Sequence, residues 1–307
     1  MSQRGIILFA AMAVIWGIPY LFIRVAVAEV SPAVLVFLRT LIGTAILLPF
    51  AIARVDLRIV LARWRWLVAF AVVEIAIPWV MLASAEQHIS SSLTGLLLAG
   101  VPLVGTVLAL VTGGADRTSR TSVAGLLIGL IGVAAIVGAD FASSDAIALL
   151  EVGVVIVGYA IGPAILARRL AGLPSVGVMS LALGLTALVY LPFAATQFPT
   201  VMPSPKVLVS IGVLAVICTA LGFIVFAALI KEIGPVRSTV ITYINPAIAA
   251  VLGVLVLNET FTLAMGVGLA LVILGSILAT RRPGAASDVR PAMPEPASAI
   301  QAGGGNG

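Results

Sequence analysis

A carboxylate and a proline lie four residues apart in one of the most apolar stretches of the chain, AVVEIAIPWVML (71–82). Proline has no backbone N–H, so in a helix Pro78 leaves the carbonyl of Glu74 without its usual partner. Burial favours the neutral form of a carboxyl group. The chemistry predicted for Glu74 is therefore exchange of a proton or direct binding of a cationic amine. The alternative is a protonated acid that is hydrogen-bonded within a helix interface.

Polar and aromatic residues at similar depth in other apolar stretches are candidates for the same site. Pro102 and Pro246 each free a backbone carbonyl, as does Pro163 for the carbonyl of Tyr159. Trp16 is either core filler or a cavity wall, and Thr242 is either a ligand or an interhelical hydrogen-bonding group. The predicted substrate-binding or proton-binding residues are Glu74, Trp16, Tyr20, Trp79, Pro102, Tyr159, Thr242, Asn245 and Pro246.

Besides Glu74, three charged residues lie within apolar stretches. Arg24 is near the end of its stretch, where it is expected to anchor at the membrane interface. Arg39 and Glu151 are predicted at equal depth and are expected to form a buried ion pair, either structural or part of an outer gate. No arginine is expected to point unpaired toward Glu74, which favours a neutral or cationic amphipathic small molecule over a polyanion as substrate.

The segments that must position these residues are transmembrane helices. The chain has 307 residues, 62% hydrophobic and 9% charged, far from the composition of soluble domains. A spanning helix needs about 20 apolar residues, and ten runs qualify: 5–27, 32–53, 66–85, 91–112, 122–139, 145–167, 176–195, 207–230, 236–257 and 262–280. The predicted fold class is an all-α integral membrane protein with ten transmembrane helices, and residues 283–307 are expected to form a disordered cytoplasmic tail.

Basic residues set the expected orientation. With a cytoplasmic N-terminus, fourteen lie at inner ends and loops and only Lys206 lies outside. The fourteen are Arg4, Arg54, Arg58, Arg63, Arg65, Arg117, Arg120, Arg168, Arg169, Lys231, Arg237, Arg281, Arg282 and Arg290. Both termini are therefore predicted to be cytoplasmic, and the net charge of +5 requires no nucleic-acid partner.

The two halves of the chain repeat each other. Shifting the second half back by about 143 residues aligns Pro49 with Pro192, Asp116 with Glu259, Gly125 with Gly268 and Gly132 with Gly275, and it aligns Pro102 with Pro246 after a one-residue gap. Residues 1–140 and 141–282 are thus predicted to be two five-helix repeats. Because five is odd, the repeats are inverted, as in many secondary transporters.

Several motifs together resemble the drug/metabolite transporter superfamily in its ten-helix EamA-type branch. They are Trp16-Gly17, Ser31-Pro32 followed by Arg39, ISSSLTG (89–95) leading to Pro102, and Asn245-Pro246 leading to Leu257-Asn258-Glu259. The resemblance covers about residues 5–282. It implies a plasma-membrane carrier, usually an exporter of amino acids, metabolites or drugs, with a cavity surrounded by the first four helices of each half.

No catalytic, nucleotide-binding or metal-binding motif occurs, and there is only one histidine and one cysteine. The prediction is a transporter and not an enzyme, with no cofactor and no metal, whose partners are a small-molecule substrate, membrane lipid and protons. Proton antiport is favoured over an uncoupled facilitator because of Glu74. A non-transporting sensor or scaffold remains the alternative. Small residues at 125, 129, 264, 268, 275 and 279 leave open a monomer or a homodimer through the fifth and tenth helices.

Overall fold

The computed structural model describes residues 2–111, 120–139, 145–234 and 238–280, and within these ranges every regular element is a helix. Eight helical stretches are long and apolar enough to cross a membrane, and two shorter apolar helices, Ile241–Leu257 and Leu263–Ala279, follow them. The eight coincide with the first eight predicted spans, and the two shorter helices lie where the ninth and tenth were predicted. The expected tail, Asp116 and several of the basic loop residues lie outside the described ranges.

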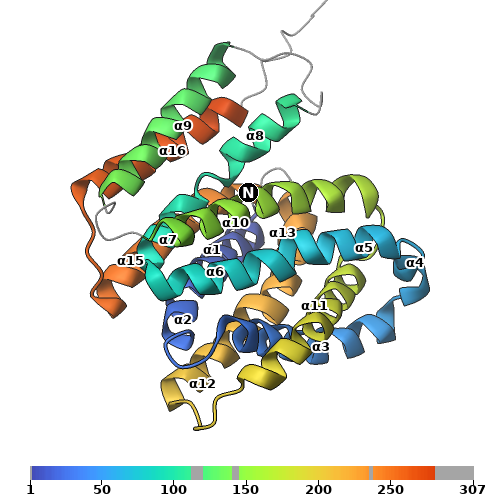
Figure 1. The fold of residues 1–307 in the computed structure, drawn as a ribbon. Coiled ribbons are helices and arrows are strands. Elements are labelled where there is room, and N and C mark those ends of the chain that lie inside the picture. The colour runs from blue at the N-terminus through green and yellow to red at the C-terminus, as the bar shows by residue number, and fades with distance from the viewer. Residues whose placement is uncertain (1, 112–119, 140–144, 235–237, 281–307) are drawn as a thin grey trace, which may run out of the picture.

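The described residues of the first half of the chain form ten helical elements (Figure 1). They are α1 (Gln3–Gly17), α2 (Pro19–Ala26), α3 (Pro32–Arg54), α4 (Leu57–Leu61), α5 (Trp64–Phe70), η1 (Ala71–Ala76), α6 (Ile77–His88), α7 (Ser91–Leu98) and α8 (Val101–Val111), followed by α9 (Arg120–Ala139). The second half consists of α10 (Ala146–Arg169), α11 (Ser175–Gln197), α12 (Pro205–Gly212), η2 (Val213–Leu221), α13 (Gly222–Ile233), η3 (Thr239–Tyr243), α15 (Asn245–Leu257) and α16 (Leu263–Thr280).

Several spans are interrupted near their middle, where the sequence places prolines. Immediately before Pro78 the helix widens into the π-helix η1, which relieves the clash of the proline ring with the preceding turn. The fourth span breaks between α7 and α8, just before Pro102. The ninth changes from the 3₁₀-helix η3 to α15 beside Pro246. Pro163, by contrast, lies inside the continuous helix α10.

A second π-helix, η2, has no proline and was not predicted. It lies in the middle of the eighth span, between α12 and α13. Within it the Thr219 hydroxyl donates to the carbonyl of Leu214, five residues earlier (2.8 Å). This bond satisfies a carbonyl in the widened turn. The sequence contains no feature from which a π-helix at this place could be read.

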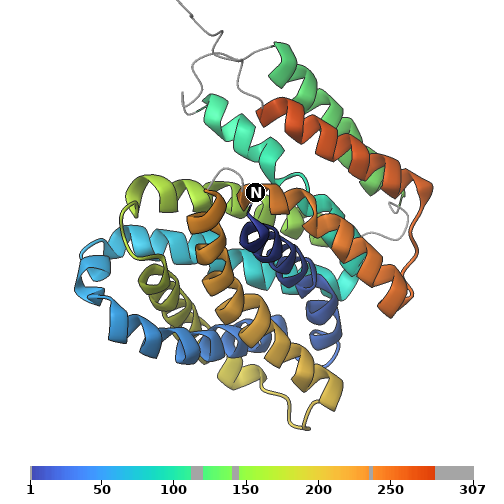
Figure 2. The ribbon, with the colours of Figure 1, turned by 180° about the vertical axis from the view of Figure 1, so that it is seen from behind.

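Helices α9 and α16 lie side by side at one edge of the bundle (Figure 1, Figure 2). They are antiparallel, and glycines allow their backbones to touch. A Cβ atom on Gly125 would lie 2.7 Å from the carbonyl oxygen of Gly275, and one on Gly132 would lie 2.7 Å from that of Gly268. These small residues therefore serve a contact within the chain. The choice between a monomer and a homodimer through these two helices stays a prediction.

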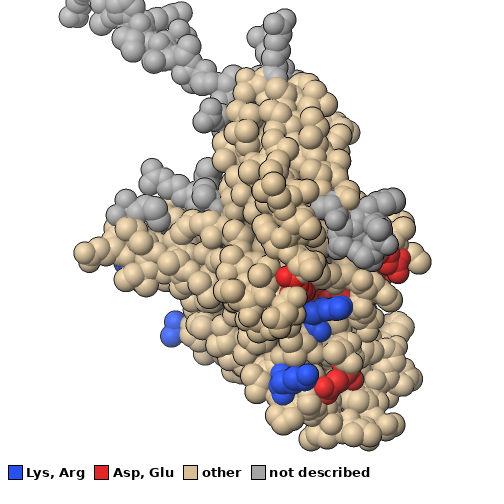
Figure 3. Space-filling model, turned by 90° about the vertical axis from the view of Figure 1, so that its left-hand side faces the viewer, with Lys and Arg blue, Asp and Glu red and all other residues tan. Residues whose placement is uncertain are grey.

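Most of the remaining surface suits hydrocarbon. Leu150 is 71% exposed and Leu188 is 67% exposed, and both lie within long apolar helices. One face, shown in Figure 3, is almost entirely uncharged among the described residues, and its few charged side chains gather toward one end. Such a surface belongs in a bilayer, because in water an apolar patch of this extent would be a site of association.

Candidate substrate and proton site

Arg39, on α3, lies at the centre of a polar and aromatic cluster. Its side chain is buried, Nε donates to the Thr219 hydroxyl (2.9 Å), and the guanidinium lies 3.6 Å from the centre of the Trp79 ring. A cation over an aromatic face is attracted by about 2 kcal/mol when both are desolvated. The arginine therefore holds together α3, η2 and α6, and one of these, η2, is an element in which the regular helix is disturbed.

Two tyrosines face this arginine. Tyr20, on α2, and Tyr159, on α10, both lie within electrostatic range of Arg39 and of each other, and the Trp79 indole approaches the Tyr159 hydroxyl closely enough for a side-chain hydrogen bond. Tyr20 also borders the crossing of α7 with α15, where a Cβ atom on Gly95 would lie 3.6 Å from its ring. Three of the predicted site residues, Tyr20, Trp79 and Tyr159, thus come together around Arg39.

The predicted ion pair between Arg39 and Glu151 is wrong. Among the described residues no ion pair joins these two side chains: Arg39 binds Thr219 and Trp79 instead, and Oε2 of Glu151 is buried without a hydrogen-bond partner. Equal depth gives only one of the coordinates that two side chains need in order to meet, and the direction in which each helix face points is a second. Arg39 is thus an arginine without an ion-pair partner among the described side chains. The expectation that every inward-pointing arginine would be paired is therefore wrong as well.

Glu74 lies in η1 against α10. A Cβ atom on Gly162 would overlap the Glu74 carboxyl group, and one on Gly158 would lie 2.6 Å from the Val73 carbonyl and 2.8 Å from the ring of Pro78. The two glycines leave the space into which the widened turn and its acid fit. Oε2 of Glu74 is buried with no hydrogen-bond partner, and Tyr159 lies within electrostatic range.

The ninth span and Trp16 have mainly structural contacts. The Asn245 amide, in the orientation that satisfies it, donates to the carbonyls of Ile241 (3.0 Å) and Ala13 (3.2 Å), so it ties α15 to α1. Trp16 packs against Phe226, with ring centres 4.6 Å apart, in an apolar cluster that includes Met12. This packing is consistent with core filler, and the choice between that role and a cavity wall stays a prediction.

The remaining predicted residues lie next to helix interruptions. Pro102 and Pro246 fall in the first turns of α8 and α15, and Thr242 lies in η3, directly before α15. The interrupted spans cross closely, since a Cβ atom on Gly95 of α7 would lie 2.5 Å from that of Ala249 on α15. These residues shape the backbone where the halves of the chain meet.

Glu86, near the end of α6, is a buried acid that the sequence prediction missed. It is 0% exposed, and neither carboxyl oxygen has a hydrogen-bond partner. The guanidinium of Arg24 donates to its backbone carbonyl and not to its carboxyl group. The third span was predicted to end at residue 85, which put Glu86 in a loop. The signal that could have found it is the continuation of apolar helix beyond that point.

Glu259, in the segment after α15, binds the first turn of α7. Its carboxylate accepts the backbone N–H groups of Ser91 (2.8 Å) and Ser92 (2.9 Å) at the first turn of α7, together with both serine hydroxyls. An anion is stabilised at a helix N-terminus by the free N–H groups and the helix dipole. Asn258 makes this approach possible, because it ends α15 in the left-handed region (φ 54°) and turns the chain back. Gly253 provides the space for the carboxylate.

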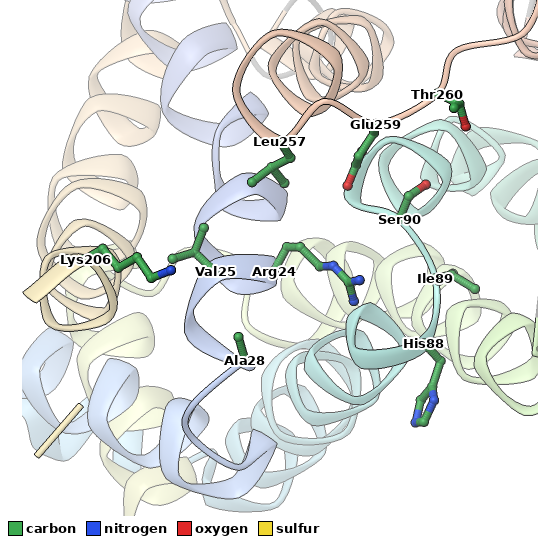
Figure 4. Close-up of a pocket in the computed structure, with 10 residues that line it drawn as sticks. All are labelled: Arg24, Val25, Ala28, His88, Ile89, Ser90, Lys206, Leu257, Glu259 and Thr260. Atoms are coloured by element: carbon green, nitrogen blue, oxygen red, sulfur yellow. The ribbon is translucent and has the colours of Figure 1, made fainter. Parts of the chain in front are cut away.

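A pocket of about 520 Å³ opens beside this contact (Figure 4). Arg24 extends from α2 toward Ser90, which precedes α7, and Glu259, which follows α15. Lys206 approaches from α12 on the other side of α2. His88 also lines the pocket. Its polar wall therefore contains two basic side chains, and its one carboxylate already has partners.

The bundle of apolar helices with a polar, interrupted interior defines a membrane transporter. The EamA-like transporter family matches residues 3–138 and 147–281, and the chain belongs to this family. The chain is 25% identical over 297 residues to the inner membrane transporter YedA of Escherichia coli strain K12, covering 93% of this chain and 95% of that protein. YedA of strain O157:H7 matches equally. A solved crystal structure has the same fold, with a TM-score of 0.65, 20% identity and coverage of 91% of this chain and 97% of the other.

Proposed function

We propose that this protein is a secondary transporter that carries a small molecule across the inner membrane by alternating access and exchanges it for protons at Glu74. The observation that carries the proposal is the position of Glu74. Its Oε2 is buried without a partner in a π-helical turn, and it lies within range of the cluster formed by Tyr159, Trp79 and Arg39. A charge at the centre of a bilayer costs about 2.5 to 3.5 kcal/mol, so such an acid is expected to have a use.

Alternating access requires two halves that can rock against each other, and the packing supports ten spans in two inverted repeats. Residues 1–140 and 141–282 would be the repeats. The contact of α1 with α13 corresponds to that of α10 with α6, and the contact of α3 with η2 corresponds to that of α11 with η1. In the repeat alignment Gly125 matches Gly268 and Gly132 matches Gly275, so the close contact of Gly125 with Gly275 corresponds to that of Gly132 with Gly268. A twofold relation between the halves would produce all three correspondences.

The orientation of the proposal has both termini in the cytoplasm. Two basic helix ends lie together: Arg63, before α5, donates to the carbonyls of Arg169 (2.9 Å) and Ala171 (3.2 Å) at the end of α10, and Arg169 stacks on Trp66. Arg4 lies 4.0 Å from Glu232. A basic end of this kind favours the cytoplasmic side.

The proposed substrates are amino acids, metabolites or amphipathic drug-like compounds, and the proposed direction is export. The aromatic rings of Tyr20, Trp79 and Tyr159 suit an amphipathic molecule, and Glu74 suits a cationic group. Arg39 has no ion-pair partner among the described side chains, so a substrate with an acidic group also fits. The runner-up is an uncoupled facilitator of the same fold, in which Glu74 binds substrate without moving a proton.

Counterflow in proteoliposomes tests the proposal. A mixed library of amino acids, metabolites and cationic dyes would be screened with and without a pH gradient, for the wild type and for Glu74→Gln. The proposal predicts a wild-type flux that responds to the gradient and a variant that retains counterflow but loses the response. A flux that ignores the gradient in both proteins would favour the facilitator. The absence of flux for every compound would favour a non-transporting sensor or scaffold.

A further inference from the structure

We propose that Glu86 is a second proton-exchanging carboxyl group of the transport path, which takes up and releases its proton toward the outer pocket beside Arg24. The inference rests on the proposed proton coupling, but it concerns a different residue at a different depth. The observation behind it is that the carboxyl group of Glu86 is fully buried and has no hydrogen-bond partner on either oxygen.

Burial without partners is costly for an ionised carboxylate and much less costly for a neutral acid. The conformation in this structure is therefore one that holds Glu86 in its neutral form. A purely structural acid would be expected to donate its proton to a neighbouring carbonyl or hydroxyl, because buried polar groups are nearly always paired. Glu86 does not, so its surroundings do not stabilise it as a fixed structural group.

The surroundings also offer a way to hold the ionised form. Arg24 already donates to the backbone carbonyl of Glu86, so a change of its side-chain rotamer would bring the guanidinium to the carboxyl group. The other charged or titratable groups that face Glu86 are Arg39 of α3, Tyr20 of α2 and Glu259 of the segment after α15. Of these, Glu259 opposes ionisation, but its own charge is held by the first turn of α7.

The pocket on the proposed outer side lies close to Glu86, although Glu86 itself does not line it. Arg24, His88 and Ile89 line the pocket of about 520 Å³, and they adjoin Glu86 through a hydrogen bond or along the chain. Tyr20 lies within range both of Glu86 and of Tyr159, and Tyr159 lies within range of Glu74. The two acids of the third span, Glu86 and Glu74, are thus connected by electrostatic interactions through Tyr20 and Tyr159. Glu86 would exchange with the outside while Glu74 exchanges at the centre.

Infrared difference spectroscopy of the full-length protein in lipid tests this without a known substrate. Spectra would be recorded as the pH is raised through neutrality, in H₂O and in D₂O, for the wild type and Glu86→Gln. The inference predicts an acid C=O band that Glu86→Gln lacks, that shifts in D₂O, and that disappears as the pH rises. In Arg24→Gln the band should persist to higher pH, because the cation that would stabilise the ionised form is gone.

Two results would overturn the inference. One is that Glu86→Gln removes no acid band at any pH, so that the group is always ionised. The other is that the band neither shifts in D₂O nor titrates, so that the proton is locked in place. Glu29→Gln is the matched control, since Glu29 is exposed and bonded to Ser204 and its loss should leave the acid band unchanged near neutral pH. Because no flux is measured, failure here leaves the test of Glu74 untouched.

Discussion

Replacing Gly162 by alanine should destabilise the contact between η1 and α10. The added methyl group would overlap the carboxyl group of Glu74 and lie 2.9 Å from its Cβ atom. Either the acid must leave its position or the two helices must separate. Overpacking of this kind costs about 1 to 3 kcal/mol. An alanine in a helix interior otherwise gains about 0.5 to 1 kcal/mol over glycine, so the clash acts against a change that is favourable elsewhere.

Gly153→Ala provides the matched control. Gly153 lies on the same helix, α10, and an added Cβ atom would have nothing within 4 Å. It should therefore be neutral or slightly stabilising. The assay is thermal unfolding in detergent micelles for the wild type and both variants, with the proteoliposome flux measured in parallel. Gly162→Ala should unfold at a lower temperature than Gly153→Ala and respond less to a pH gradient.

The double variant Gly162→Ala with Glu74→Ala sharpens this test. It removes the carboxyl group that the new methyl group would overlap, so it should recover part of the lost stability relative to Gly162→Ala alone. Equal stability of Gly162→Ala and Gly153→Ala would refute the close contact between Glu74 and Gly162. That result would also contradict the argument that α10 holds Glu74 in place.

Three further predictions follow from single contacts. Thr219→Val should cost about 1 to 3 kcal/mol because it leaves the buried Nε of Arg39 without an acceptor, whereas Thr219→Ser should be nearly neutral; thermal unfolding distinguishes them. Glu259→Gln should cost about 1 to 2 kcal/mol through the loss of a charge at the first turn of α7, and exchange of the amide hydrogens of that turn should become faster. Hydrogen bonds from Ser204 hold the pKa of Glu29 below its ordinary value of 4.5, so its contribution to stability is present above that value and is lost as the pH falls through the lower folded value. Comparing the pH dependence of unfolding in the wild type and Glu29→Gln should show this difference only in the acid range.

Much of the fold could be predicted because spanning a membrane constrains the sequence strongly. Runs of apolar residues located the helices, and prolines located the disturbances at Pro78, Pro102 and Pro246. Each of these predictions depends on a local property: an apolar segment must be helical in lipid, and a proline removes a backbone hydrogen bond from the turn before it. The second rule did not hold at Pro163, which lies in a continuous helix. The π-helix η2 escaped because a widened turn can also arise from tertiary packing, which leaves no mark in the local sequence.

The candidate site was predicted less completely, since depth along a helix does not determine the direction in which a side chain points. Tyr20, Trp79 and Tyr159 lie near Arg39 in the structure, and their role in binding stays a prediction, whereas Arg39 was paired with the wrong group. Glu86 was missed because the predicted end of its helix was short by one turn. Helix ends are commonly misplaced by a few residues. Here the error assigned the buried acid Glu86 to a loop.

The central claim is that substrate and protons move in opposite directions through Glu74. Proteoliposomes loaded with a pH-sensitive dye, to which a substrate found by counterflow is added, test it most directly. The account predicts a substrate-dependent change of internal pH with the wild type and none with Glu74→Gln, although the variant still exchanges labelled for unlabelled substrate. Substrate movement without any change of internal pH in the wild type, or an unchanged pH response in Glu74→Gln, would contradict it.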